Sequence, residues 1–310
     1  MSVKTPSTLE KILASGQQAV TSEIGPPRST DGAEIEHKAN LIKDYVDAIN
    51  VTDNQTSVVR LCSLAACIRL KQMGLEPVMQ MTTRDRNRIA IQSDILGAAS
   101  FGINNILCLT GDHQIFGDHA ASANVFDLDS VQLLETVRLM RDEGKLMSGF
   151  DLPSRPNMFV GAAENPFAGP NVLVRAMRLA KKIKAGAEFI QTQCIYNIPK
   201  FKEWLKIAVD KGLTQKVHIL AGITPFKSLG MARYMKSRVP GMDVPDNLIE
   251  RLKGVPKEKQ AEEGIRLAIE MMQELKGLNG VKGFHIMAIE WEEKVPELVK
   301  GAGLYPRPTA

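Results

Sequence analysis

Apolar residues recur along the chain in two alternating patterns. Eight short apolar runs are typical of buried parallel strands, because both faces of such strands are covered. They span residues 18–24, 48–54, 76–83, 105–112, 157–164, 189–195, 216–224 and 283–289. Between them, apolar residues recur at helical spacing over residues 33–45, 57–73, 86–101, 130–143, 172–185, 200–211 and 226–239, and two further helices are predicted over 246–253 and 258–278.

Glycines follow five of the predicted helices, shortly before the next strand: Gly74, Gly102, Gly144, Gly186 and Gly212. A glycine there supplies the left-handed conformation that the turn out of a helix requires. The strict alternation, without a pronounced linker, predicts a single domain over residues 1–310. Its expected fold is a (β/α)8 TIM barrel with an N-terminal helical extension. An open doubly wound sheet is the alternative, because a strand count does not show closure.

The composition, with 44% hydrophobic and 24% charged residues, is typical of a soluble globular protein. A net charge of +4 without a dense basic tract does not indicate a nucleic-acid partner. We expect a cytoplasmic protein without membrane insertion, because no apolar stretch is long enough to span a bilayer and the first residues lack a signal-peptide core. The scattered cysteines, Cys62, Cys67, Cys108 and Cys194, lie in apolar runs and favour reduced thiols.

Polar residues end the predicted strands, and in a parallel barrel these ends share one rim, where barrel enzymes keep their chemistry. The rim residues are Glu23, Thr52, Asp53, Asn54, Gln80, Thr82, Asp112, Glu164, Gln193, Thr224 and Glu290. Glu23 is followed by the stiff, partly apolar segment IGPP. Desolvation there would favour the protonated carboxyl group that a general acid needs, whereas the alternative is a carboxylate that caps a loop.

Asp112 and Gln193 are candidate binding residues. Asp112 follows Thr110 and Gly111 and would accept hydrogen bonds from an amino-substituted heterocycle, or else cap a turn. Gln193 offers a donor and an acceptor to the edge of a heterocycle, or else satisfies buried backbone groups.

Arginines and histidines give weaker signals. Arg84 and Arg88 are spaced to share a helix face and to meet phosphate or carboxylate, although a solvated first turn is the simpler interpretation. His113 and His119, each beside an aspartate, have no helical register, so no metal site is predicted. The absence of GxxxxGK[ST], GxSxG and a clear GxGxxG after a strand disfavours kinase, hydrolase and Rossmann functions.

Six short motifs resemble those of the methylenetetrahydrofolate reductase family. They are SEIGPP, NVTDN, TTRDRNR, LTGD, AGAEFIQTQ and GITP, which stand in order at successive predicted strand ends and cover nearly the whole chain. The resemblance implies a flavin-containing β/α barrel that reduces methylenetetrahydrofolate to methyltetrahydrofolate.

The resemblance also implies roles for single residues. Glu23 matches the family's general acid, which assists opening of the folate ring to an iminium that takes a hydride from flavin N5. Asp112 matches an acid near the pterin and the flavin, and Gln193 matches a glutamine that contacts the pterin. Residues expected at the flavin are Thr52, Gln80, Thr82, Thr110, Gly111, Asp112, Glu164, Arg175, Arg178 and Lys182. Of these, Lys182 matches a lysine of the flavin phosphate region.

The chain departs from the common family pattern at residues expected near the ends of the bound cofactor and substrate. Thr110 stands where many relatives carry arginine, and Arg175 and Arg178 stand where they carry acidic or amide residues toward the adenine. FAD is the family default, and FMN, which needs no adenosine contacts, is a serious alternative. Met287 and Trp291 replace tyrosine and arginine, so binding of NADH or of the folate tail is expected to differ.

Electrons are expected from NAD(P)H or from an iron-sulfur partner subunit, since the chain lacks cysteine clusters for such centres of its own. A homo-oligomer is the other partner considered for this chain.

Two rival functions remain. A Schiff-base lyase needs a lysine at a strand end, whereas Lys200, Lys216 and Lys227 fall at helix or strand starts. A non-catalytic assembly subunit is disfavoured by the retained rim residues.

Overall fold

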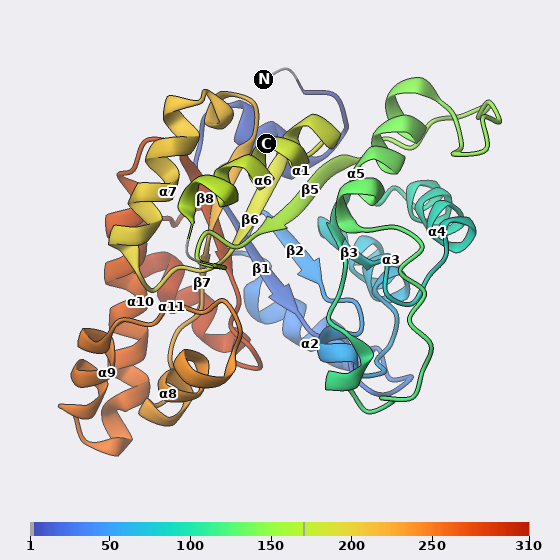
Figure 1. The fold of residues 1–310 in the computed structure, drawn as a ribbon. Helices are drawn as coiled ribbons and strands as arrows, with labels where there is room; N and C mark the ends of the chain where they lie inside the picture. The colour runs from blue at the N-terminus through green and yellow to red at the C-terminus, as the bar shows by residue number, and fades with distance from the viewer. Residues whose placement is uncertain (1–2, 170, 310) are drawn as a thin grey trace.

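Eight parallel strands close into a barrel in the computed structural model, which describes residues 3–169 and 171–309 (Figure 1). The strands are β1 (Ala19–Ile24), β2 (Ala48–Val51), β3 (Pro77–Thr82), β4 (Asn105–Leu109), β5 (Phe159–Glu164), β6 (Phe189–Cys194), β7 (His218–Ile223) and β8 (Val281–Ile286). Each strand pairs with the next along the chain, and β8 pairs with β1. The predicted barrel is therefore confirmed, and the open sheet is excluded.

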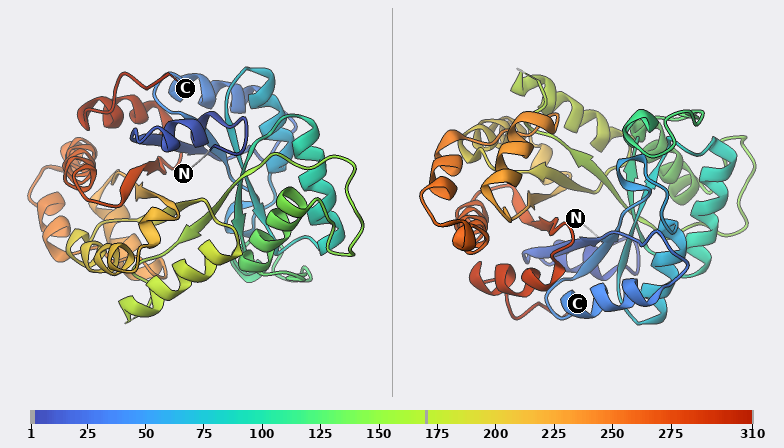
Figure 2. Two further views of the ribbon diagram at one scale, coloured as in Figure 1. Left: turned by 90° about the horizontal axis from the view of Figure 1, so that it is seen from above. Right: turned by 90° about the horizontal axis from the view of Figure 1, so that it is seen from below.

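Helices surround the barrel in a ring, and one more covers its amino-terminal end (Figure 2). They are α1 (Thr8–Ala14), α2 (Ala33–Ile42), α3 (Ser63–Gln72), α4 (Arg88–Ser100), α5 (Ser130–Arg138), α6 (Val172–Ala185), α7 (Ile198–Asp210), α8 (Leu229–Arg238), α9 (Asp246–Lys253), α10 (Gln260–Lys276) and α11 (Val295–Gly301). α6 and α9 have the predicted bounds, whereas α11 had no counterpart among the predicted helices. In the part of the chain that the structure describes, no helix combines the length and apolar character needed to cross a membrane.

Several predicted helix starts are displaced by two or more residues, among them those at residues 57, 86, 200, 226 and 258. Local reasons explain the first two. The helix predicted from residue 57 begins only at Ser63, because Ser57 has a positive φ and the backbone is extended at Val58 and Cys62. The helix predicted from residue 86 begins at Arg88, because the Asn87 side chain accepts hydrogen bonds from the next backbone amides and caps it.

The five glycines predicted to close helices all have positive φ, between 65° and 120°. A side chain would strain the backbone in this region, so glycine is the residue that these turns require. The positive φ at these positions is thus confirmed. After Gly74, Gly102, Gly186 and Gly212 the next strand begins within a few residues, whereas after Gly144 a longer loop leads to β5.

The helix α1 covers the amino-terminal end of the barrel, as the view from above shows (Figure 2). Its residues Leu9, Ile12 and Leu13 join one buried cluster with Phe159 and Phe189 at the starts of β5 and β6. The Ser7 hydroxyl caps α1 and donates to Asn105 Oδ1 at the start of β4, 2.6 Å away. The predicted N-terminal helical extension is thus confirmed, and it closes the end of the barrel opposite the predicted rim.

All four cysteines are free. Cys67, Cys108 and Cys194 are buried, as expected of thiols in apolar runs. Cys62 is exposed instead, because it stands at the surface where α3 begins. Burial raises the pKa of the Cys194 thiol to about 11, so this thiol stays protonated at neutral pH.

Candidate active site

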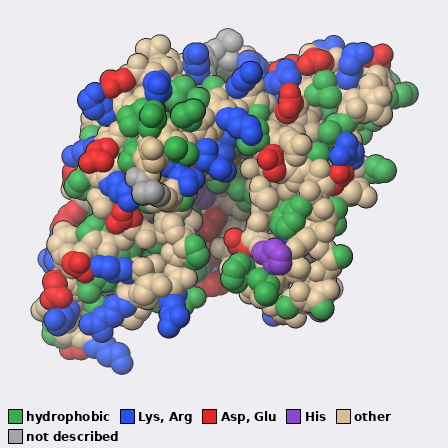
Figure 3. Space-filling view, in the orientation of Figure 1, with side chains coloured by type: hydrophobic (Ala, Val, Ile, Leu, Met, Phe, Trp, Pro, Cys, Tyr) green, Lys and Arg blue, Asp and Glu red, His purple; other side chains and the backbone are tan. Residues whose placement is uncertain are grey.

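A cavity of about 540 Å³ opens at the carboxyl ends of the strands, and a hollow is visible in the space-filling view (Figure 3). Nine predicted site residues line it: Glu23, Gln80, Thr110, Asp112, Glu164, Arg175, Arg178, Lys182 and Gln193. The remaining lining residues are Leu107, Leu109, Ala163, Asn165, Gln191, Thr192, His285 and Met287. The sequence therefore located most of the cavity but missed several residues of its floor.

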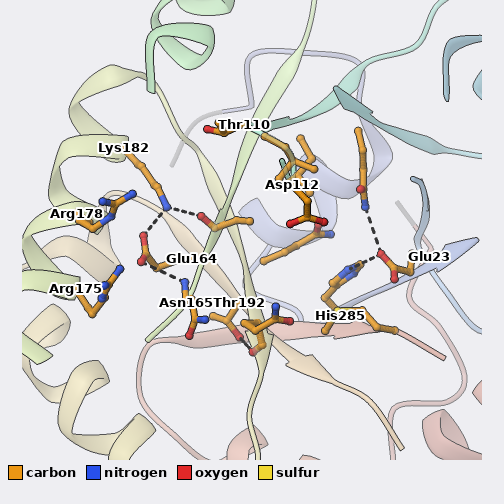
Figure 4. A pocket seen from close by; sticks show the side chains of 17 residues that line it. Glu23, Thr110, Asp112, Glu164, Asn165, Arg175, Arg178, Lys182, Thr192 and His285 are labelled. Carbon is orange, nitrogen blue, oxygen red and sulfur yellow. Dashed lines mark hydrogen bonds and ion pairs between the residues drawn. The ribbon is translucent and has the colours of Figure 1, made fainter. Parts of the chain in front are cut away.

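Two unlike walls face each other across the cavity (Figure 4). Arg175, Arg178 and Lys182 lie together on α6, while Glu23 and His285 lie on the opposite side. Because cations gather on one wall and an acid stands on the other, the cavity can hold an anionic group at one side and transfer a proton at the other.

Glu23, near the end of β1, is held through one of its carboxyl oxygens. Gln80 Nε2 donates to Glu23 Oε2 at 3.3 Å, and His285 Nε2 lies 3.7 Å from the same oxygen. The Glu23 side chain is 13% exposed. No hydrogen bond within residues 3–169 and 171–309 engages Glu23 Oε1, so this oxygen is the one available to a ligand.

A hydrogen-bonded network below Glu23 crosses the barrel interior. Gln191 Nε2 donates to Thr21 Oγ1 at 3.0 Å and to Asn50 Oδ1 at 2.9 Å, and Asn50 Nδ2 donates back to Gln191 Oε1 at 2.7 Å. Thr21 Oγ1 lies 2.9 Å from His285 Nδ1. The sequence interpretation missed His285 and Gln191. Their signal is a polar residue within a strand predicted to be buried, because the outer face of such a strand packs against apolar helices and a polar side chain points to the barrel interior instead.

Glu164 and Lys182 form a buried ion pair in the cationic wall. Lys182 Nζ lies 2.6 Å from Glu164 Oε2 and also donates to the Ala163 carbonyl. The two charges therefore offset each other, and Lys182 is already paired where the family resemblance places it near a phosphate.

Arg175 and Arg178, unlike Lys182, form no ion pair among the described residues. Within residues 3–169 and 171–309, neither has a carboxylate partner, and the buried Nε of Arg175 has no hydrogen-bond acceptor. A buried donor without an acceptor is costly in a folded protein. The pair is therefore suited to bind an anion such as a phosphate.

The loop after β4 presents Asp112 to the cavity. Gly111 has φ of 88°, and a Cβ there would lie 3.1 Å from Thr82 Cβ. The Asp112 carbonyl accepts hydrogen bonds from Arg84 Nη1 and Ser57 Oγ. The backbone of Asp112 is thus fixed, while its carboxylate is exposed and lines the cavity.

Three residues expected at the cofactor, Thr52, Thr82 and Gly111, do not line the cavity. The Thr82 hydroxyl donates to Asp53 Oδ2 instead. The Thr52 hydroxyl is buried and has no partner among the described residues. Thr82 and Gly111 support the loop that carries Asp112, and none of the three reaches the cavity directly.

The arginines of the TTRDRNR motif bind carboxylates and carbonyls of the protein itself. Arg86 pairs with Asp53, and Arg88 pairs with Asp127 and lowers the pKa of that carboxyl group to about 2. Arg84 is buried, so a solvated first turn is wrong for it, and it precedes α4, so it shares no helix face with Arg88. These side chains hold the rim loops in place.

A β-bulge in β6 determines which side chains form the cavity floor. Between Gln191 and Cys194, β6 holds one residue more than β7, which is a β-bulge. Thr192 and Gln193 therefore both line the cavity together with Gln191, whereas regular alternation would turn one of the three away. Gly222 of β7 fits here because a Cβ would lie 2.1 Å from the Thr192 carbonyl oxygen.

His113, considered with His119 as a metal ligand, contacts other residues of the loop after β4. His113 accepts a hydrogen bond from Ile115 N, and its Nε2 lies 2.8 Å from Asn124 Nδ2. Among the described residues, no three His, Cys, Asp or Glu side chains are arranged to hold a metal ion.

Comparisons with known proteins give a consistent result. The family model described as methylenetetrahydrofolate reductase matches residues 8–303. A probable methylenetetrahydrofolate reductase (NADPH) of Caenorhabditis elegans is 22% identical over 312 residues, which cover 96% of this chain and 44% of that protein. Methylenetetrahydrofolate reductase 2 of Schizosaccharomyces pombe is 25% identical over 317 residues, covering 97% and 48%. This chain thus spans just under half the length of these two relatives.

The fold is shared with solved structures, one of which is similar over nearly the whole chain. It is an uncharacterized protein from Clostridium thermocellum, described as binding two copies of 5-methyl-5,6,7,8-tetrahydrofolic acid. The TM-score is 0.65 at 14% identity, and the match covers 95% of this chain and 97% of the other. At this level of identity, the likeness extends to the barrel architecture.

Proposed function

The chain belongs to the methylenetetrahydrofolate reductase family, and on that premise we propose that it reduces 5,10-methylenetetrahydrofolate to 5-methyltetrahydrofolate with a bound flavin. The observation that carries the proposal is Glu23, an acid in the cavity wall that faces a cationic wall and has one oxygen free for a ligand. A reductive ring opening needs a positioned proton donor beside a site for an anionic cofactor, and the cavity combines the two.

The residues of the cationic wall fit a flavin phosphate. Arg175 and Arg178 carry uncompensated charge, and the orphaned Arg175 Nε needs an acceptor such as a phosphate oxygen. When bound, a reduced flavin supplies a hydride from its N5 nitrogen. FAD is the family default, while FMN has a single phosphate, for which Arg175 and Arg178 offer donors.

Glu23 supplies the proton in this proposal. Its Oε2 accepts from Gln80, so the proton to be delivered resides on Oε1. Protonation of the folate nitrogen that leaves the five-membered ring would open that ring to an iminium, which is the form that accepts a hydride. After delivery, Gln80 stabilises the negative charge left on the Glu23 carboxylate.

Asp112 and Gln193 hold the pterin in this proposal. The Asp112 carboxylate lies between the two walls (Figure 4) and can accept hydrogen bonds from the amino-substituted edge of the pterin. Gln193 Oε1 accepts from its neighbour Cys194 N, which leaves the Gln193 amide NH2 to donate toward the ligand. The two side chains thus offer an acceptor and a donor at different points of the same cavity.

The proposed electron donor is NAD(P)H or an iron-sulfur partner subunit. The printed names of the relatives include NADPH-dependent and NADH-dependent enzymes. Met287 lines the cavity, so its replacement of the family's tyrosine bears directly on which donor fits.

The decisive experiment measures whether the protein binds a flavin and whether methylenetetrahydrofolate reoxidises it. The purified protein is examined for a visible flavin spectrum, the cofactor is released by heat and identified as FAD or FMN, and the chemically reduced protein is then mixed with methylenetetrahydrofolate without oxygen. Reoxidation of the flavin with formation of methyltetrahydrofolate is the expected result. Tetrahydrofolate, which lacks the methylene bridge, is the control and should leave the flavin reduced. A protein that neither holds nor takes up flavin would overturn the proposal.

A further inference from the structure

The histidine beneath the candidate acid has no role in the function described so far. We propose that His285 is a positioning residue, held by the barrel network as the tautomer with its proton on Nε2, which directs that N–H at Glu23 Oε2. This inference rests on the proposed function for its catalytic consequence, while the tautomer itself rests on the network alone.

The tautomer follows from counting donors along the network. The Thr21 hydroxyl has one proton, and its oxygen already accepts from Gln191 Nε2. Its proton can be given to His285 Nδ1 at 2.9 Å or to the Phe284 carbonyl at 3.4 Å. The hydroxyl oxygen could also accept from a protonated Nδ1, but its own proton would then have only the long contact to the Phe284 carbonyl, and an unprotonated Nε2 would face the acceptor Glu23 Oε2. With Nδ1 as the acceptor both problems disappear, so Nδ1 carries no proton in this proposal.

The Gln191 amide is itself fixed. Its oxygen and its nitrogen both pair with the amide of Asn50, at 2.7 and 2.9 Å, and all of these side chains are buried. Buried polar networks of this kind are costly to rearrange, because each member would lose its partner. The orientation of Gln191 therefore fills one acceptor site of the Thr21 hydroxyl and leaves the Thr21 proton free to be donated to His285 Nδ1.

In its neutral form, an imidazole held in this way carries its proton on Nε2, 3.7 Å from Glu23 Oε2. This distance is longer than a hydrogen bond, but contacts between catalytic groups tighten when substrate binds. Together with Gln80, His285 would engage Oε2 from two sides and leave the acidic proton to Oε1 on the cavity side. His285 acts on the reaction through Glu23 and touches no substrate in this account.

Nitrogen NMR of the imidazole tests the tautomer without any turnover. The flavin-loaded protein labelled with nitrogen-15 histidine is measured at mildly alkaline pH, and the His285 signals are identified by their loss in His285→Asn. We expect a protonated Nε2 and an unprotonated Nδ1. The opposite tautomer would overturn the inference. Thr21→Val, which removes the hydroxyl donor, should redistribute the proton between the two nitrogens.

Two substitutions separate positioning from packing. A glutamine side chain can place an NH2 donor near the position of His285 Nε2, whereas asparagine is too short to reach it. His285→Asn should slow flavin reoxidation by methylenetetrahydrofolate about tenfold, while flavin reduction is unchanged, and His285→Gln should recover most of the loss. Equal losses in both variants would contradict a donor role.

The dependence on Glu23 provides the last test. In a Glu23→Gln background, His285→Asn should cause no further loss, because both residues act through the same proton. Additive losses would overturn the inference. If the wild-type protein does not reduce the folate at all, the proposed function fails, and the nitrogen spectrum still decides whether His285 is held as inferred.

Discussion

Glu164 Oε2 lies 2.6 Å from Lys182 Nζ, and the two side chains are only 1% and 9% exposed. The pair brings two opposite charges into the cavity wall, so the wall gains no net charge from either. This arrangement leaves the recognition of an anion to Arg178 and Arg175, which lie about one and two helical turns from Lys182 toward the start of α6.

Breaking this ion pair should be costly. Lys182→Ala leaves the Glu164 carboxylate buried without its partner, and we expect the free energy of unfolding to fall by about 3 kcal/mol. Urea titration of the flavin-free protein measures the change, and Lys206→Ala, from the exposed pair with Asp210, is the control with an expected loss below about 0.5 kcal/mol. Equal effects would show that burial of the Lys182 pair does not matter.

Removing either free arginine should weaken binding of a flavin phosphate. Arg175→Ala or Arg178→Ala each removes a charge-assisted hydrogen bond, and we expect the dissociation constant of FMN or FAD to rise about tenfold. Flavin fluorescence quenching gives the constants, with Lys184→Ala on the same helix as the surface control.

Riboflavin gives a second control for the arginine variants, because it has the flavin ring but no phosphate. Wild-type protein and both variants should bind riboflavin alike. A loss of riboflavin binding as large as that of FMN would place the arginines somewhere other than at the phosphate.

Replacing the candidate acid should separate the two half-reactions. Glu23→Gln keeps the shape of the side chain but has no proton to deliver, so flavin reoxidation by methylenetetrahydrofolate should slow by about 100-fold or more. Flavin binding and its reduction by dithionite should stay unchanged. Stopped-flow absorbance follows both steps, and Glu36→Gln on α2 is the surface control. Unimpaired reoxidation would remove Glu23 from the mechanism.

Acid should destabilise the protein partly through His218, at the start of β7. Burial lowers the pKa of its imidazole from 6.5 to about 4, and Lys282 acts in the same direction. The unfolded chain therefore binds the proton more readily, so this stabilisation is complete above pH 6.5 and is lost as the pH falls toward about 4. The loss should approach roughly 3 kcal/mol.

The His218 contribution can be isolated by substitution. His218→Gln should flatten the decline in unfolding free energy between these two pH values, measured by urea titration across the range. His37→Gln controls for the loss of a surface imidazole. An unchanged slope in His218→Gln would assign the acid sensitivity to other groups.

Much of the barrel was predictable because its signals are local. Each strand is a short apolar run, and each glycine such as Gly74 or Gly212 marks a turn that demands positive φ. The rim residues followed from the same reasoning, since a residue that ends a parallel strand must lie on one face of the barrel.

What could not be predicted depends on contacts between distant segments. Nothing in FIQTQCI indicates that β6 gains a residue against β7, because a bulge is a relation between two strands. The position of His285 next to Glu23 could not be predicted, because it depends on the pairing of β8 with β1. Arg84 looked like an anion ligand, but its partners Ser57 and Asp112 become neighbours only in the folded barrel.

The helix that closes the barrel has a consequence for biosynthesis. Leu9 of α1 shares a buried cluster with Leu220 of β7, so its apolar face has no complete binding surface until almost the entire barrel has left the ribosome. Non-local contacts of this kind form slowly, and apolar surface that waits for them is prone to aggregate. We therefore expect α1, made before every strand, to dock among the last elements and to depend on chaperone protection until it does.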